Sequence, residues 1–302
     1  MDTQPWLKAM RDYAAHILRE EPMARHTTFG IGGPAEVFFA PPSVEAVVAA
    51  LAASRASGIP LRVMGNGSNL LVADAGVRGV VMQLGKNLSG CALEGSAPSH
   101  TILAQAGVSL AVLAKSAADW GLQGLAFAGG IPGCLGGALC MNAGAYGGQM
   151  ADVVTHVQVA DADGARWIAA ADLDFGYRHS RVTELGVAVA ARLALVGGER
   201  SEILAEMQRL AAARREKQPL QYPSAGSYFK RPSGDYAARL IEESGLKGMA
   251  WGGAAVSALH AGFVVNMGGA TCADVLALQQ LVQQTVQTKF GVWLEPEVAF
   301  WD

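Results

Sequence analysis

Apolar positions in the first half of the chain recur with the periods of alternating strands and helices. Residues 35–41 and 59–65 are short apolar runs bounded by proline or glycine, which is typical of buried strands. Residues 43–58, between them, place apolar side chains at helical spacing. The three segments together predict a βαβ unit, and a further strand and helix are predicted at 100–107 and 109–121.

The second half of the chain changes to an antiparallel pattern. Residues 153–170 alternate on both sides of an Asp-Gly pair, which predicts a hairpin, and 187–198 continues as a strand. A long charged helix at 199–219 ends at a proline and is predicted to lead into a new unit. Beyond it we expect a helix at 235–245, a strand at 261–269, a helix beginning at Thr271 and a strand-like end at 291–302. Pro296 confines that last segment to a sheet edge or a bulge.

Composition narrows the class of protein. The chain has 302 residues, 51% of them apolar, and a net charge of −3 without a basic stripe, which disfavours nucleic-acid binding. Residues 120–151 lack charged side chains, but glycines and Pro132 interrupt the stretch, so a membrane-spanning helix is not expected. The N-terminus lacks the apolar core of a signal peptide, which favours a cytoplasmic location. The four cysteines have neither disulfide-scaffold nor zinc spacing, so we expect free thiols and no metal.

Two glycine-rich stretches are candidates for binding a phosphorylated or flat ligand. Residues 63–71 (VMGNGSNLL) leave an apolar strand through Gly65 and Gly67, where backbone N–H groups can converge on an anion, although an ordinary tight turn is equally compatible. Residues 125–148 are dense in glycine, which suits close approach of a ligand to the backbone or a tightly packed backbone crossing. Neither stretch has the Rossmann or P-loop spacing.

Three polar stretches carry side chains suited to acid–base chemistry. These are FGYRHS at 175–180, PSAGSYFK at 223–230 and LEPEV at 294–298. An arginine can clamp a carboxylate, a serine can donate a proton and a glutamate can orient either group. Each also has an ordinary surface interpretation, and sequence alone does not bring them together.

These motifs occur in the order found in a known family. RHTTFGIGGPAE, GNGSNLL, FAGGIPG, MNAGAYGG, FGYRHS, PSAGS and LEPEV together resemble the UDP-N-acetylenolpyruvoylglucosamine reductases over residues 25–300. Those flavoenzymes make UDP-N-acetylmuramate for bacterial peptidoglycan. The short span between FGYRHS and the strand at 187 resembles the subclass without an extra substrate-capping loop.

The resemblance implies an α+β protein with a vanillyl-alcohol-oxidase-type (PCMH-type) FAD-binding fold of two α/β units plus a C-terminal α+β substrate domain. We expect the first FAD-binding unit at 1–86, the second at 87–200 and the substrate domain at 201–290. The terminal strand 291–302 could return to the second unit. We expect non-covalent FAD, NADPH as reductant, a nucleotide-sugar substrate, and no nucleic-acid or membrane partner.

In the family, NADPH reduces the flavin and leaves, and the enolpyruvyl ether then takes its place. Hydride passes to C3 of the substrate and a proton to C2. By motif position, Arg178 and Glu297 match the residues that hold the enolate, and Ser227 matches the proton donor. The small residues Ala225 and Gly226 are then expected to let flavin and substrate approach the Ser227 hydroxyl.

The resemblance also implies the remaining site residues. The residues expected around FAD are Gly65, Asn66, Gly67, Ser68, Asn69, Leu70, Gly129, Gly130, Ile131, Pro132, Gly133, Gly136, Gly137, Asn142, Ala143 and Gly144. The residues expected on the substrate are Tyr177, Lys217, Lys230 and Arg231.

Several assignments keep alternatives. Lys230 could reprotonate the serine or bind the diphosphate, and Lys217 could bind the diphosphate or be a solvated charge at a helix end. Glu295 and Glu297 would share a strand face, so spacing does not choose between them, and only the family motif selects Glu297.

Three residues depart from the family pattern. Arg231 replaces an asparagine, Tyr228 stands where an aliphatic residue or phenylalanine is common, and Cys134 stands where serine or threonine is usual. Two rival functions are an oxidase of the same fold with covalently bound flavin, and a nucleotide-sugar binding module without catalysis.

Overall fold

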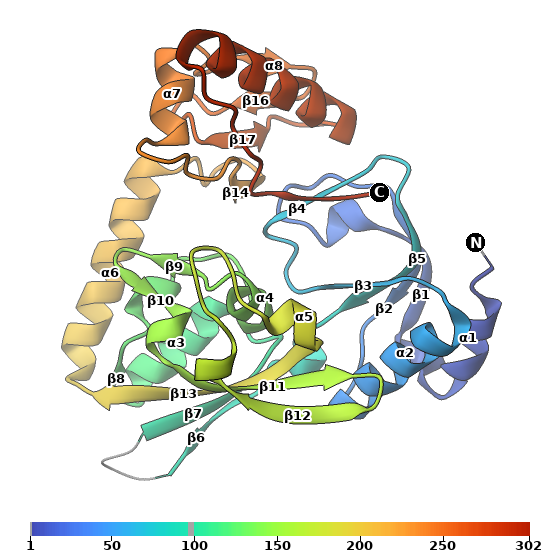
Figure 1. The fold of residues 1–302 in the computed structure, drawn as a ribbon. Coiled ribbons are helices and arrows are strands. Elements are labelled where there is room, and N and C mark those ends of the chain that lie inside the picture. The colour runs from blue at the N-terminus through green and yellow to red at the C-terminus, as the bar shows by residue number, and fades with distance from the viewer. Residues whose placement is uncertain (1, 96–99) are drawn as a thin grey trace. The chain divides into compact units, whose positions relative to one another are not determined.

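The computed structural model describes residues 2–95 and 100–302, which form two compact units (Figure 1). The larger unit consists of the described residues of Met1–Arg19, Val37–Asn66 and Gly79–Ala213. The smaller unit consists of Glu20–Glu36, Gly67–Arg78 and Arg214–Asp302. Each unit therefore combines segments that are distant in sequence, and each is described by itself.

Helices and strands occur along the whole of the described chain. The α-helices are α1 (Gln4–Ala9), α2 (Val44–Ser57), α3 (Leu110–Asp119), α4 (Leu135–Cys140), α5 (Val182–Leu185), α6 (Arg200–Lys217), α7 (Ala237–Glu243) and α8 (Cys272–Phe290). The 3₁₀ helices are η1 (Arg11–His16), η2 (Met23–Arg25), η3 (Lys86–Leu88), η4 (Ala126–Ala128), η5 (Met150–Asp152) and η6 (Ala170–Asp172). The strands are β1 (Ile17–Pro22), β2 (Pro34–Phe39), β3 (Leu61–Met64), β4 (Leu70–Val72), β5 (Val77–Gln83), β6 (Cys91–Glu94), β7 (His100–Gln105), β8 (Leu122–Gln123), β9 (Gly144–Ala145), β10 (Gly148–Gln149), β11 (Val154–Asp161), β12 (Gly164–Ala169), β13 (Val187–Gly197), β14 (Ser224–Ser227), β15 (Ala250–Trp251), β16 (Ala254–Val256), β17 (Phe263–Asn266) and β18 (Ala299–Trp301).

The predicted βαβ segment is present, with one strand more than expected. Helix α2 begins at Ser43, whose hydroxyl accepts from the Ala46 N–H, and ends at Gly58 in the left-handed conformation, as its capping residues dictate. The strands on either side of it, β2 and β3, lie in one sheet of order β1-β2-β5-β3. Strand β5, which was not predicted, pairs in parallel with β3 and separates it from β2.

A sheet that lies wholly within the larger unit has the order β12-β11-β13-β7-β6, and β8 pairs with β13. The predicted hairpin is confirmed, with β11 and β12 paired in antiparallel register from His156 opposite Ala169 to Asp161 opposite Gly164. Buried side chains of α3 and α4 form the core on one side of this sheet, and those of α2 form a second core with Ala160 and Val189.

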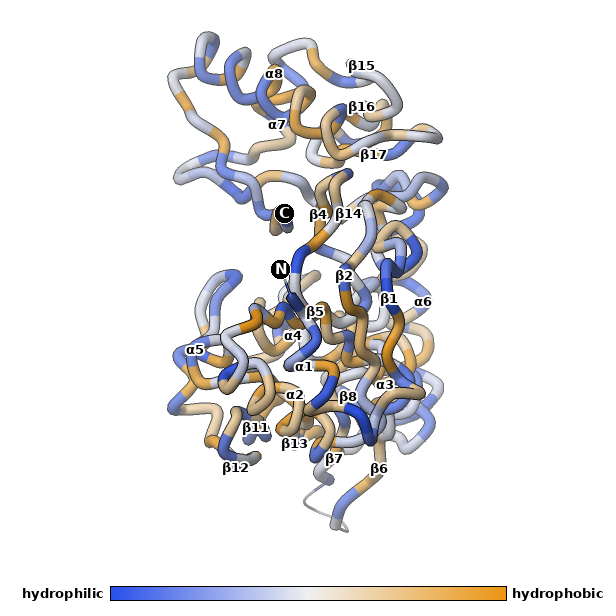
Figure 2. The backbone as a smooth tube through the Cα atoms, turned by 90° about the vertical axis from the view of Figure 1, so that its right-hand side faces the viewer, coloured by the Kyte–Doolittle hydropathy of each residue, from blue (hydrophilic) through white to orange (hydrophobic). Residues whose placement is uncertain are grey.

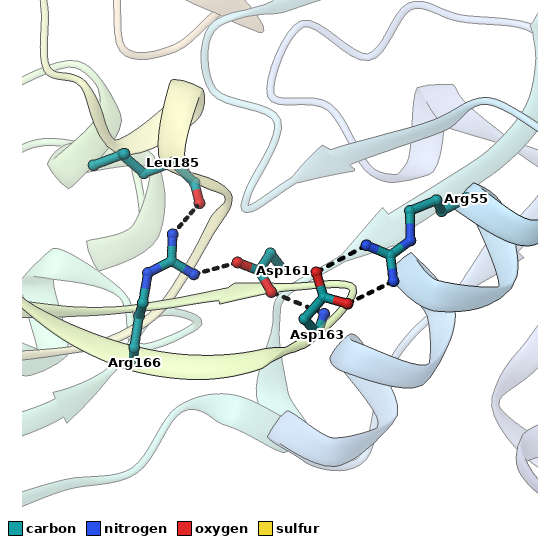
Figure 3. A network of polar contacts seen from close by, with 5 residues as sticks. All are labelled: Arg55, Asp161, Asp163, Arg166 and Leu185. Atoms are coloured by element: carbon teal, nitrogen blue, oxygen red, sulfur yellow. Dashed lines mark hydrogen bonds and ion pairs between the residues drawn. The ribbon is translucent and has the colours of Figure 1, made fainter.

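An ion-pair network joins α2 to the hairpin turn (Figure 3). Both guanidinium nitrogens of Arg55 donate to the Asp163 carboxylate, at 2.8 and 2.6 Å. The Asp163 N–H donates to Asp161, which also accepts from Arg166, and Arg166 donates to the Leu185 carbonyl. The Arg55 guanidinium lowers the pKa of the Asp163 carboxyl.

The smaller unit contains an antiparallel sheet of order β14-β17-β16-β15 that carries α7 and α8. Helix α8 opens with the predicted Thr271 cap in a capping box with Asp274, and it alternates apolar and polar segments along its length (Figure 2). The Asp74 carboxylate accepts from the Cys272 and Ala273 N–H groups at the start of this helix, at 2.8 and 3.1 Å. The segment that follows β4 is therefore tied to α8.

The C-terminal segment differs from expectation. Only Ala299–Trp301 of 291–302 form a strand, β18, which pairs in parallel with β4 of the smaller unit. The expected return of this strand to residues 87–200 is therefore wrong. Pro296 forms an isolated antiparallel bridge with Phe229 beside the edge strand β14, as the absence of its N–H requires.

Candidate functional site

In the smaller unit, the serine stretch and the glutamate stretch lie side by side. The Glu297 N–H donates to the Tyr228 carbonyl at 2.8 Å, and the Lys230 N–H donates to the Glu295 carbonyl at 2.8 Å. The bridge between Phe229 and Pro296 lies between these two bonds. Two motifs separated by about 70 residues are thus joined at the residues next to Ser227.

The stretch 65–71 enters the same unit from Gly67 onward. Asn69 contacts the glutamate stretch twice, because its side-chain amide donates to the Glu297 carbonyl at 3.0 Å and its carbonyl accepts from the Ala299 N–H at 2.9 Å. Both backbone polar groups of Glu297 are therefore held by named partners. These hydrogen bonds fix the position of the Glu297 backbone, which carries a half-buried side chain.

A fourth motif completes this arrangement. The Thr28 N–H donates to the Gly67 carbonyl at 3.2 Å, and the Thr28 hydroxyl donates to the Ser224 carbonyl at 2.7 Å. The RHTTFG motif therefore lies against both the turn at Gly67 and the start of the serine stretch.

Ser227 ends strand β14 with its side chain exposed. The register of β14 against β17 shifts between Ser224 and Ser227, at Gly226, whose φ of +79° disfavours other residues. A Cβ at Gly226 would meet no heavy atom within 4 Å, whereas Ala225 is buried in the core of the unit. Gly226 thus leaves open space beside Ser227, but the small size of Ala225 serves core packing.

The two glutamates differ in their surroundings. Glu295 is exposed and its carboxylate lies 3.2 Å from the Lys230 ammonium, which is also exposed. Glu297 is half-buried. Exposed ion pairs of this kind contribute about 0–1 kcal/mol, so the pair with Glu295 leaves Lys230 available to an anionic ligand.

The other two basic residues expected on the substrate are also in the smaller unit. The Arg231 guanidinium lies over the Tyr236 ring at 4.0 Å from its centroid, and both side chains are exposed. Lys217 is the last residue of α6 and is exposed, where its charge also suits the helix C-terminus.

In the larger unit, the turn that carries Arg178 is attached to the glycine-rich segment. Gly176 and His179 exchange backbone hydrogen bonds around Tyr177 and Arg178, and Arg178 has a φ of +55°, which is uncommon for a residue with a side chain. The Asn142 amide donates to the Gly176 carbonyl at 3.0 Å, and the Ser180 hydroxyl donates to the Leu139 carbonyl at 2.8 Å. The Arg178 guanidinium lies 5.5 Å from the centroid of the exposed Tyr177 ring.

The Asn142 side chain is 3% exposed and has three protein partners. Besides Gly176, its amide donates to Gln149 at 3.0 Å and its oxygen accepts from the Ala151 N–H at 2.9 Å. Its side chain thus positions the backbone around it. Sequence reasoning assigned Asn142 only to the cofactor and did not foresee these bonds.

The glycines of the two candidate stretches divide into two kinds. A Cβ at Gly65 would lie 2.0 Å from Cys134 Sγ, one at Gly136 would lie 3.0 Å from the Ala106 Cβ, and one at Gly144 would lie 2.8 Å from the Gly148 carbonyl oxygen. Packing within the chain therefore explains these three. A Cβ at Gly137, which is exposed in α4, would meet nothing within 4 Å.

Cys134 occupies the N-cap position of α4 without a side-chain capping hydrogen bond. A serine or threonine there would accept from the first turn of the helix, whereas a thiol is a poor acceptor. The Cys134 sulfur packs against Gly65 instead. All four cysteines are free, as expected, and burial raises the pKa of the neighbouring Cys140 thiol to about 11.

Within residues 2–95 and 100–302, no helix combines the length and apolar character that crossing a membrane requires.

The chain is similar to known flavoproteins in both of its parts. The family described as "FAD binding domain" matches residues 35–169, and the family described as "UDP-N-acetylenolpyruvoylglucosamine reductase, C-terminal domain" matches residues 218–301. An alkyldihydroxyacetonephosphate synthase structure, 15% identical with a TM-score of 0.51, covers 65% of this chain and shares the fold. The fold and the matched domain define an FAD-dependent oxidoreductase.

Full-length relatives specify the family. A UDP-N-acetylenolpyruvoylglucosamine reductase of Agathobacter rectalis is 48% identical, with 93% of each chain covered. The enzyme of Caldanaerobacter subterraneus is also 48% identical, covering 95% of this chain and 96% of its own. The crystal structure of the Thermus caldophilus enzyme covers 95% of this chain and 98% of its own, with 37% identity and a TM-score of 0.81.

The chain therefore belongs to the UDP-N-acetylenolpyruvoylglucosamine reductases, in their short form of about 300 residues. The family uses FAD and NADPH to reduce the enolpyruvyl ether of UDP-N-acetylglucosamine to UDP-N-acetylmuramate for peptidoglycan. The expected fold class, flavin and nucleotide-sugar substrate are confirmed at this level.

Proposed function

We propose that Ser227 donates the proton to C2 of the enolpyruvyl group while Arg178 and Glu297 polarise and hold the enolate. FAD, which the glycine-rich residues would hold, would supply the transfer of hydride from NADPH to C3. The observation that supports the proposal is the contact between the two motifs: Glu297 N–H bonds to the carbonyl of Tyr228, the residue after Ser227, at 2.8 Å.

The surroundings of Ser227 suit a proton donor. Its hydroxyl is exposed beside the open space at Gly226, so a substrate carbon can approach it. A serine hydroxyl is a weak acid near pH 7, and it can protonate C2 only because a carbanion-like carbon is strongly basic. The serine must then regain a proton, and Lys230, three residues on, is one source.

Glu297 is the better candidate of the two glutamates. Asn69 and Tyr228 fix its backbone on both sides and its side chain is half-buried, whereas the Glu295 side chain is exposed. A catalytic carboxylate needs a fixed position more than it needs exposure. Glu297→Gln is expected to slow turnover far more than Glu295→Gln.

Arg178 suits recognition of the substrate carboxylate. Its guanidinium can bind a carboxylate with two parallel hydrogen bonds, and the positive φ at this residue is the kind of strain that persists where the surrounding structure imposes it. The contacts from Asn142 and Ser180 to the same turn supply that constraint.

The glycine-rich residues fit a flavin in one testable respect. Gly137 lacks a side chain although nothing in the protein lies where its Cβ would be, as expected if a ligand covers that backbone. We propose that the residues assigned to FAD on the family motif, at 65–70, 129–133, 136–137 and 142–144, line the cofactor. Tyr177, Lys217, Lys230 and Arg231 are proposed to contact the nucleotide sugar.

The domain boundaries at 86, 200 and 290 also remain part of the proposal. They differ from the compact units, in which residues 20–36 and 67–78 pack with 214–302.

The function is tested by anaerobic mixing in two steps. NADPH should bleach the yellow colour of the flavoprotein, and the enolpyruvyl substrate should then restore it with formation of one UDP-N-acetylmuramate per flavin. A colourless protein, or colour that NADPH does not bleach, would contradict the proposal. Lys230→Ala separates its two roles, because a raised KM with unchanged kcat indicates diphosphate binding and a lowered kcat indicates proton supply.

A further inference from the structure

Three side-chain hydrogen bonds in the smaller unit run from Tyr228 across helix α8 to Leu294. The Tyr228 hydroxyl donates to Gln279 Oε1 at 2.8 Å. Gln279 Nε2 donates to Gln283 Oε1 at 3.3 Å, one helical turn further on. Gln283 Nε2 then donates to the Leu294 carbonyl at 2.8 Å. We call these residues the α8 polar chain.

A backbone hydrogen bond in the candidate site joins the two ends of the α8 polar chain, so that these residues form a ring. The Glu297 N–H, three residues after Leu294, donates to the Tyr228 carbonyl at 2.8 Å. The Tyr228 N–H in turn donates to the Gly262 carbonyl at 2.8 Å. Ser227 and Glu297 are therefore attached directly to Tyr228, whose backbone and side chain all have hydrogen-bond partners.

The two ends of the α8 polar chain are buried. Tyr228 is 2% exposed, Gln283 is 6% exposed and Leu294 is fully buried, whereas Gln279 between them is half-buried. Buried polar groups that lose a partner cannot replace it with bulk water. Each donor also points the same way along the chain, so the bonds polarise one another.

Core packing alone does not account for a hydroxyl at position 228. A phenylalanine would fill the same volume without needing a partner, whereas a buried hydroxyl is costly unless it is hydrogen-bonded. Gln283 alone would satisfy the buried Leu294 carbonyl. The tyrosine and Gln279 extend this bond back to the segment that carries Ser227.

We propose that the α8 polar chain is a positioning device that fixes the register between the Ser227 segment and the Glu297 segment. Tyr228, Gln279 and Gln283 act on the reaction through those segments and not by touching the substrate. The inference rests on the proposed roles of Ser227 and Glu297. It adds Tyr228, Gln279 and Gln283 to the residues that set the geometry of proton transfer.

The test uses the FAD-loaded full chain and anaerobic stopped flow of the two half-reactions. Tyr228→Phe removes one hydroxyl and Gln283→Leu removes the link to Leu294. Both variants should be reduced by NADPH within about two-fold of the parent rate and reoxidised by substrate about 3- to 30-fold more slowly, since a displacement near 1 Å can cost on the order of 10² in rate. The double variant should be no slower than the slower single variant, because one broken link opens the ring.

Thr285→Val is the matched control. Its hydroxyl donates to the Leu281 carbonyl within α8, outside the polar chain, so this variant should reoxidise at the parent rate. Reoxidation of Tyr228→Phe at the parent rate would overturn the inference, whatever its melting temperature. If Gln283→Leu does not fold, Tyr228→Phe still decides.

The same measurement on Ser227→Ala separates this inference from the proposed function. If Ser227→Ala is slow in reoxidation and Tyr228→Phe is not, only the positioning role fails. If neither variant is slow, the proton-donor assignment fails as well.

Discussion

The side-chain amide of Asn142 donates a hydrogen bond to the carbonyl of Gly176, two residues before Arg178, at 3.0 Å. This bond connects the glycine-rich stretch with the arginine turn inside the larger unit. It makes Asn142 a residue that holds the shape of that turn, whose strained Arg178 backbone needs support from outside.

Replacing Asn142 by alanine should therefore impair Arg178. The variant leaves the Gly176 carbonyl with only the His179 N–H as a partner, and it removes the side-chain oxygen that accepts from the Ala151 N–H. Substrate reoxidation should slow by at least about ten-fold, because the guanidinium loses its fixed position. Val157→Ala, a core change in the same unit, should lower the melting temperature without that kinetic effect. Equal kinetic effects in the two variants would contradict the prediction.

Gly65 and Cys134 form a close pair whose size can be tested by a double substitution. Gly65→Ala places a methyl group 2.0 Å from the Cys134 sulfur, so one of the two segments must move and stability should fall by about 1–3 kcal/mol. Cys134→Ala removes the sulfur, and the remaining Cβ would lie 3.6 Å away. The double variant should recover most of the loss in thermal unfolding and flavin content. An unaltered melting temperature in Gly65→Ala alone would show that the pair is not close.

A substitution at Gly137 tests whether the absence of a side chain there serves protein stability or FAD binding. Alanine in a helix is favoured over glycine by about 0.5–1 kcal/mol, so Gly137→Ala should stabilise the flavin-free protein. The same methyl group should weaken FAD binding if the cofactor covers this backbone. Gly197→Ala, also in open space, serves as the control. Parent-like flavin retention in Gly137→Ala after gel filtration would argue against the assignment.

The ion pair between Arg55 on α2 and Asp163 in the β11–β12 turn should contribute less to stability as the pH falls. The Arg55 guanidinium lowers the folded-state pKa of Asp163, so this contribution to stability is present above the unfolded value of about 3.9 and is lost as the pH falls through the folded value. Asp163→Asn should lower the melting temperature slightly at pH 7 and progressively less toward pH 3. The difference should also shrink in high salt, since both groups are exposed. A difference that is constant with pH and salt would mean that charge plays no part.

Local signals were enough to predict much of the fold. Ser43 and Thr271 cap the starts of helices with their side chains, and Gly58 ends a helix in the left-handed conformation. These helix ends follow from a few neighbouring residues. The β11–β12 hairpin follows in the same way from alternation around one turn. Helix α4 was missed because Gly136 and Gly137, poor helix formers, occupy its centre and tertiary packing outweighs their propensity.

The site depended on information that sequence does not contain. The contact between Glu297 and Tyr228 joins residues about 70 apart, and only the fold shows it. The motifs indicated that Ser227 and Glu297 belong to one site, through the family resemblance. Gln279 and Gln283 gave no signal, because polar residues one turn apart on a helix usually face solvent.

Proton donation from Ser227 to C2 is the step of the proposed reaction that kinetics can test most directly. Anaerobic stopped flow of Ser227→Ala should show NADPH reducing the flavin at the parent rate, while reoxidation by the enolpyruvyl substrate slows by a factor on the order of 10²–10⁴. Reoxidation at the parent rate, or an equal loss in both half-reactions, would contradict the assignment.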